Sequence, residues 1–204
     1  MKKYFTRLLL LVSAVAALPA CRETSKLPEP ATESVPLIIP EINPQKSYFD
    51  YQLARNSVAT TTASGMARPV FEFVVNPSKG YTELQTVEVY KSFRRNNILG
   101  PRVKVMDLTS FPATVSLNSQ DAIKDLFASS PTTANPTPTP ILATSTGARN
   151  NMFNGEAIVF TFEYILKDGR RIVLTPLSTS TGSVGAPIGT FVNPPYTAVA
   201  EFRL

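Results

Sequence analysis

The sequence predicts a mainly β protein: an antiparallel immunoglobulin-like β-sandwich with one short helix. From residue 67 onward, short runs of β-branched and aromatic residues alternate with polar residues, and turn residues separate the runs. One segment has apolar residues at helical spacing and a residue suited to cap a helix. About seven short strands in one chain of this length is a typical number for a sandwich.

The expected strands can be located by their alternating residues. In 71–75, Phe71, Phe73 and Val75 share one side, and in 82–93 the apolar set is Val87, Val89 and Phe93. Such alternation is typical of strands with one buried face. The remaining predicted strands are 102–106, 111–117, the two arms of a hairpin between Glu156 and Pro176, and 196–202.

The sequence of the hairpin is compatible with two alternative turns. A two-residue turn at Asp168-Gly169 would place Tyr164 opposite Val173 and mix apolar with charged residues. A three-residue turn over 167–169 places Tyr164 opposite Ile172 and Phe162 opposite Leu174, with Gly169 in the left-handed conformation of a bulge. Because the second register gathers the apolar residues on one face, we predict it.

A single helix is expected after Asn118. The Asn118 side chain can cap the first turn, and Asp121 three residues later completes a pattern similar to a capping box. The apolar face of this helix is expected to be core, and it comprises Ala122, Ile123, Leu126 and Phe127. Residues 129–150, rich in Pro, Thr and Ser, form a long irregular loop that is either functional or disordered.

The first residues predict export and a lipid anchor. A positive start precedes an apolar run of 11 residues, Leu8–Leu18, which is shorter than the roughly 20 residues of a membrane span. We expect residues 1–20 to be a lipoprotein signal peptide, cleaved after Ala20, with Cys21 receiving the lipid. Two or three acyl chains would hold the protein stably on the membrane. The alternative is an ordinary secretory signal that leaves Cys21 as a free thiol.

The domain boundaries follow from composition. Residues 21–66 are rich in Pro, Thr, Ser and Glu and are expected to be a lipid-anchored tether. Within this tether, 35–39 is either a first edge strand or plain linker. The β-sandwich domain is expected to span 67–204, including the irregular loop 129–150.

Composition narrows the possible functions. Without residues 1–20 the chain has 17 basic and 15 acidic residues, so no nucleic-acid partner is expected. The pairs Arg94-Arg95 and Arg170-Arg171 are interpreted as solvated charges beside turns. The chain contains no His, and Cys21 is its one Cys. We therefore expect no enzyme, no cofactor and no metal site.

Two sets of residues are candidates for other chemistry. Tyrosines could stack on sugar rings, although strand packing is their ordinary role; the candidates are Tyr81, Tyr90 and Tyr196. A less expected class is hydrolysis by paired carboxylates, which needs two acids with separated pKa values. The acidic residues on or near predicted strands are Glu72, Glu83, Glu88, Asp107, Glu156 and Glu163.

Several segments together resemble β-sandwich surface lipoproteins of Bacteroidetes that accompany starch-utilisation-type uptake systems. They are the Cys21 signal, the Pro-rich tether, and the runs 87–90, 110–115, 160–164, 167–170 and 191–196. The resemblance implies a non-catalytic outer-membrane lipoprotein, accessory to glycan uptake or to assembly of outer-membrane complexes. Its implied partners are an outer-membrane transporter and a capture lipoprotein. A stand-alone module that binds polysaccharide is the alternative.

Overall fold

The computed structural model describes residues 36–56, 68–78, 82–96, 98–129, 132–145, 148–173 and 196–204. Over these residues the protein is mainly β, with two short α-helices and one 3-10 helix. The elements are β1 (Glu41–Ile42), η2 (Pro44–Lys46), β2 (Tyr48–Asp50), α2 (Tyr51–Asn56), β3 (Val70–Val75), β4 (Leu84–Arg95), β5 (Ile98–Leu99), β6 (Val103–Leu108), β7 (Ala113–Asn118), α3 (Ser119–Ile123), β8 (Ala157–Leu166), β9 (Arg171–Val173) and β10 (Ala198–Arg203). The predicted signal peptide, Ala20, Cys21 and tether residues up to 35 lie outside the described residues.

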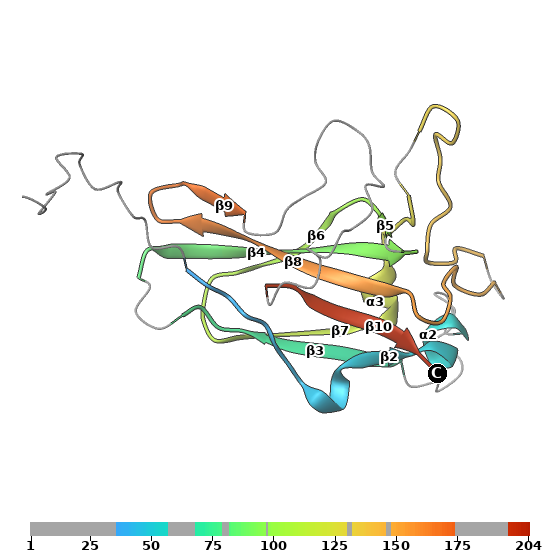
Figure 1. The fold of residues 1–204 in the computed structure, drawn as a ribbon, viewed down its shortest axis with the longest axis horizontal. Coiled ribbons are helices and arrows are strands. Elements are labelled where there is room, and N and C mark those ends of the chain that lie inside the picture. The colour runs from blue at the N-terminus through green and yellow to red at the C-terminus, as the bar shows by residue number, and fades with distance from the viewer. Residues whose placement is uncertain are drawn as a thin grey trace, which may run out of the picture. The chain divides into compact units, whose positions relative to one another are not determined.

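The described strands form two sheets. The smaller sheet has three strands in the spatial order β1-β3-β7. The larger sheet has seven strands: five lie in the spatial order β2-β10-β8-β4-β5, while β6 pairs with β4 and β9 pairs with β8. Figure 1 shows β4 and β8 side by side along most of their length. All pairs are antiparallel except β2 and β10, which run parallel, so the larger sheet is mixed. This one pair departs from the predicted all-antiparallel arrangement.

Aromatic residues join the two sheets. Phe71 and Phe73 of β3 contact Phe160 of β8, with ring centroids 5.7 and 5.3 Å apart. These rings are fully buried, and burial of such a side chain contributes about 1.5–3 kcal/mol. The alternation predicted for 71–75 is confirmed, because Phe71, Phe73 and Val75 all lie in the core.

The hairpin has the predicted three-residue turn. Tyr164 lies opposite Ile172, and the Leu166 amide donates to the Arg170 carbonyl at 2.9 Å. Gly169 has a φ of +85°, the left-handed conformation that glycine adopts without steric cost. The expected pair of Phe162 and Leu174 lies outside the described residues, since 174 is not among them.

The predicted cap of α3 is confirmed, but the helix is shorter than expected. The Asn118 side-chain oxygen accepts from the amides of Gln120 and Asp121, both at 3.0 Å. The helix ends at Ile123, and Asp125 then has a φ of +61°. Leu126 is nevertheless buried, because the turn returns the chain to the core, while Phe127 forms a bridge with Pro140.

Residues 36–56 belong to the folded unit, whereas the sequence placed them in the tether. The unit begins at Pro36, and Phe49 and Ala54 are fully buried. Phe49 pairs with Phe202 in the parallel β2–β10 ladder, and their rings lie 5.4 Å apart. Residues 35–39 were expected to be either an edge strand or plain linker. Within the described part, 36–39, the structure has an isolated β-bridge between Ile38 and Pro77. Prolines here are compatible with folding because they lie outside the strands.

The irregular loop carries both exposed and core residues. Ile141 is 0% exposed and its amide donates to the Leu126 carbonyl at 2.9 Å. The buried Asn150 side chain donates to the Ala54 carbonyl at 2.8 Å. The loop is therefore hydrogen-bonded to the rest of the domain at Ile141 and Asn150, which argues against the disordered alternative at these two positions. In the described part of the chain, no helix has the length and apolar character needed to cross a membrane.

Candidate binding pocket and charged sheet face

Three of the candidate carboxylates lie in one row across the larger sheet. Glu88 of β4 is directly opposite Glu163 of β8 on one side and Asp107 of β6 on the other. The other candidates are dispersed: Glu72 lies on β3 and pairs with Lys46, Glu83 precedes β4, and Glu156 precedes β8. The sheet thus brings Glu88, Glu163 and Asp107 together, which spacing in the sequence did not show.

Basic residues neutralise this row. The Lys104 ammonium lies 2.7 Å from a Glu88 oxygen and 2.8 Å from an Asp107 oxygen. Arg171 forms ion pairs with both Glu88 and Glu163, and Arg102 forms another with Glu163. We call Glu88, Asp107, Glu163, Arg102, Lys104 and Arg171 the charged row.

Two carboxyl groups of the charged row, those of Glu88 and Glu163, have lowered pKa values. Hydrogen bonds from Lys104 and then Arg171 lower the pKa of Glu88 to about 2. Burial alone would raise the pKa of Glu163, but hydrogen bonds from Arg102 and Arg171 outweigh it and hold that pKa below its usual value. General acid catalysis by a carboxyl group needs a raised pKa in one member of the pair. The pKa values of Glu88 and Glu163 are both lowered instead, so their ion pairs are suited to joining neighbouring strands.

Among the candidate tyrosines, Tyr90 has its ring covered by a neighbouring side chain. The Arg102 guanidinium covers the Tyr90 ring at 3.9 Å from its centroid, and the Tyr90 hydroxyl donates to Glu88 at 2.9 Å. Tyr196 is partly buried, and Tyr81 lies outside the described residues. The most exposed aromatic ring of the described chain is instead Phe153, at 55%.

Phe153 lines a pocket where the end of β4 meets the start of β8. The pocket has a volume of about 340 Å³. Its lining residues are Arg94, Arg95, Asn96, Phe153, Asn154, Gly155 and Glu156. Asn96 and Gly155 both have positive φ, at 50° and 86°, so tight turns form two of its walls.

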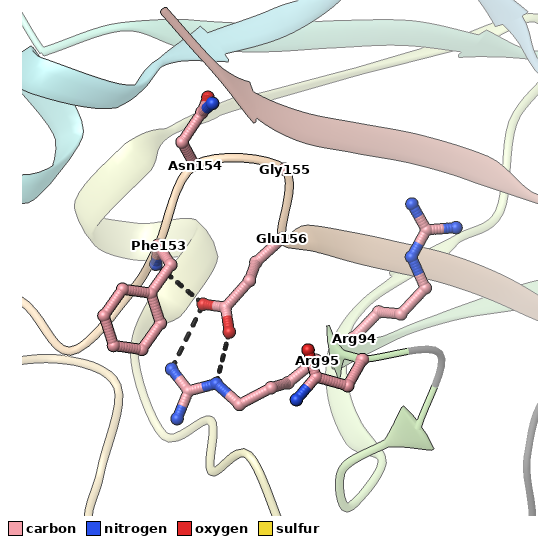
Figure 2. Close-up of a pocket in the computed structure, with 7 residues that line it drawn as sticks. Arg94, Arg95, Phe153, Asn154, Gly155 and Glu156 are labelled. Atoms are coloured by element: carbon pink, nitrogen blue, oxygen red, sulfur yellow. Dashed lines mark hydrogen bonds and ion pairs between the residues drawn. The ribbon is translucent and has the colours of Figure 1, made fainter.

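An ion pair between Arg95 and Glu156 forms the rigid side of the pocket. The two groups make a two-point contact, and Glu156 Oε2 also accepts from the Phe153 amide at 2.8 Å (Figure 2). Arg95 donates to the Asn151 carbonyl at 2.9 Å and lies 5.1 Å from the centroid of the Phe153 ring. The charge of Arg95 is therefore compensated and its side chain fixed, in contrast to the solvated charge that the sequence suggested.

Arg94 is bound more loosely. Figure 2 shows its guanidinium turned away from the Arg95–Glu156 pair. Its ion pair with Glu201 measures 3.4 Å, whereas Arg203 approaches the same carboxylate at 2.7 Å. The Arg94 contact is therefore longer than a typical charge-assisted hydrogen bond, which measures about 2.7–2.9 Å, and the Arg94 side chain is 18% exposed.

Sequence reasoning identified Glu156 and the Arg94-Arg95 pair but did not connect them, and it missed Phe153. The local indication was Asn154-Gly155, a turn-forming pair that leaves the preceding aromatic residue at a loop tip. No cluster of three or more potential metal-ligating acidic, His or Cys side chains occurs within the described ranges.

Comparisons of the chain with protein-family models, with curated proteins and with solved structures found no match.

Proposed function

We propose that the protein is a non-catalytic lipoprotein, anchored through Cys21 in the outer membrane, that serves as an accessory in glycan uptake or in the assembly of outer-membrane complexes. Its partners in this proposal are an outer-membrane transporter and its capture lipoprotein. The sequence features behind it are the signal ending at Ala20 and the single Cys at position 21.

The start of the folded unit is the observation that most favours this role. The unit begins at Pro36, so only residues 22–35 separate the anchor from the domain, compared with the tether to residue 66 that composition suggested. Fully extended, this segment reaches about 50 Å at most. A domain on such a short tether can contact only partners close to the same membrane.

The charged row also favours a structural role over catalysis. Its acidic groups are matched by bases from neighbouring strands, and the pKa values of Glu88 and Glu163 are lowered. Such pairs position strands and add specificity to their register.

Co-purification tests the proposed role. The tagged protein would be isolated from gently solubilised outer membranes, with Cys21→Ser as the control that lacks the anchor. We expect an outer-membrane transporter and a lipoprotein partner in the wild-type sample and their loss from the control. Recovery of the wild-type protein alone would contradict the accessory role.

Glycan binding is a second candidate function, and the exposed Phe153 ring favours it. The ring lies 5.1 Å from the Arg95 guanidinium and lines a pocket of otherwise mainly polar residues, and an apolar ring face next to polar groups suits a sugar. Calorimetry with a broad polysaccharide panel tests this candidate. Absence of heat with every polymer would contradict it.

We also propose the finer fold class, an immunoglobulin-like β-sandwich. The aromatic contacts between β3 and β8 support it, since they come from the facing sides of two sheets. An experimental structure in which the two sheets do not pack face to face would contradict it.

A further inference from the structure

We propose that the outer edge of β7 (Ala113–Asn118) pairs antiparallel with β7 of a second copy of this chain, so that the two three-stranded sheets join across a two-fold axis. The inference goes beyond the proposed function, because it depends neither on the lipid anchor nor on another protein.

One side of the β7 backbone has no neighbouring strand within the described residues. β7 is the last strand in the order β1-β3-β7. The Ser119 amide donates to the Pro69 carbonyl at 2.9 Å and continues the register between β3 and β7. Because hydrogen bonding alternates along an antiparallel pair, the N–H and C=O groups of Thr114 and Ser116 point away from β3. A strand edge of this kind is a template for pairing with another chain.

The opposite edge of the same sheet is blocked by prolines. The Leu37 carbonyl and the Asn43 amide form hydrogen bonds on the β3 side, at 2.9 and 3.0 Å. Residues an odd number of positions away from these two therefore face the open side. Pro36 and Pro40 occupy such positions, and proline has no N–H to offer an added strand.

The remaining outer strands are short or charged. β2, β5 and β9 have two or three residues each. β6 carries the exposed Lys104 and Asp107, and its pairing with β4 shifts register between Val89 and Tyr90. In β7, by contrast, the six residues include no charge and no proline, and the register with β3 is continuous. Among the described outer strands, β7 is therefore the one without a feature that opposes pairing.

The sequence of β7 is complementary to itself, which favours a second copy as the occupant. With the two-fold axis at Val115, the exposed Thr114 lies opposite the second copy's Ser116, a pair that can form a hydrogen bond. On the inner face, the partly buried Ala113 lies opposite the second copy's Leu117, and Val115 lies opposite its counterpart. Since β7 carries no charge, this pairing brings no like charges together. Such a two-fold contact of one patch with itself is the commonest form of homodimer.

Sedimentation equilibrium would test the pairing on the full chain isolated from membranes, in a mild detergent of matched density and over a range of concentrations. We expect the mass of two chains at high concentration and of one chain after dilution. Ser116→Pro removes an N–H that donates in two symmetry-related hydrogen bonds, so the dissociation constant should rise about tenfold or more. The matched control, Ser116→Ala, keeps this N–H and should weaken the dimer much less.

Two charged variants test the register. Thr114→Lys/Ser116→Lys places like charges opposite each other across the axis and should weaken the dimer. Thr114→Glu/Ser116→Lys places opposite charges there and should restore it. Both variants have the same residue beside Glu72 of β3, so they differ at position 114 alone. Circular dichroism and the urea midpoint check that all variants are folded.

Three results would overturn the proposal. A single chain at every concentration would overturn self-pairing; if Ser116→Pro then released a co-purifying protein, the edge would belong to a strand of that protein. A dimer unchanged by Ser116→Pro would overturn the assignment to β7. Equal dimerisation of the two charged variants would overturn the register.

Discussion

Lys91 lies on the buried side of β4, and replacing it should change how stability depends on pH. It shares that side with Val89 and Phe93 and is 5% exposed. Its ammonium donates to the Asp121 carbonyl at 2.7 Å, near the end of α3. Burial lowers the pKa of Lys91 to about 8, while Asp125 and Asp121 partly oppose the shift and Lys124 adds to it.

Proton linkage determines whether stability rises or falls with pH. Between pH 8 and the ordinary pKa of 10.5 the unfolded chain binds more protons at Lys91 than the folded chain does, so stability rises with pH through this window. Below about pH 8 the cost of burying the charge is fully present. From the lowered pKa this cost is about 3 kcal/mol at most.

Lys91→Met removes the charge and keeps a long apolar side chain. The Asp121 carbonyl loses its donor, which costs about 1 kcal/mol, so we expect a net gain of about 1–2 kcal/mol near neutral pH. The assay is urea unfolding followed by circular dichroism from about pH 7 to pH 10, with Lys167→Met as a control that removes an exposed lysine. The gain should shrink as pH rises. A difference between wild type and Lys91→Met that is constant with pH would refute the reasoning.

Three further substitutions have defined outcomes. Gly100→Ala would place a methyl group 2.0 Å from the Phe127 carbonyl oxygen, so urea unfolding should show a loss of about 2 kcal/mol or more; an unchanged midpoint would contradict this close approach. Phe71→Ala should cost about 3–5 kcal/mol in the same assay, because the ring is fully buried between the sheets, and a loss below about 1 kcal/mol would be inconsistent with that packing. Glu88→Gln should reduce the acid sensitivity of folding, since ionised Glu88 stabilises the fold above its ordinary pKa of 4.5 and this contribution is lost as pH falls toward 2. If the stability of Glu88→Gln and of the wild type fell equally steeply as pH decreases, the stabilising role of Glu88 in the charged row would be contradicted.

Local patterns in the sequence predicted the elements whose structure is decided locally. The hairpin register follows from Tyr164, Ile172 and Gly169, which lie close together in the chain. The cap of α3 depends on Asn118 and the two amides that follow it. In both cases the residues that determine the geometry lie within ten positions of one another.

Features that depend on distant pairing were missed. The strand Tyr48–Asp50 is too short to show alternation, and its partner is β10 at the other end of the chain. The neighbouring prolines therefore dominated the interpretation of 36–56 as tether. The pocket depends in the same way on Arg95 meeting Glu156 across two strands, a contact between residues 61 positions apart.

The mass of the mature protein isolated from membranes would decide whether Cys21 is the anchor on which the proposed function depends. The expected mass is that of residues 21–204 plus a diacylglyceryl group on Cys21 and, where the amine is acylated, one further chain. A mature chain that begins elsewhere, or one that carries Cys21 as an unmodified thiol, would contradict the lipid anchor and the accessory role built on it.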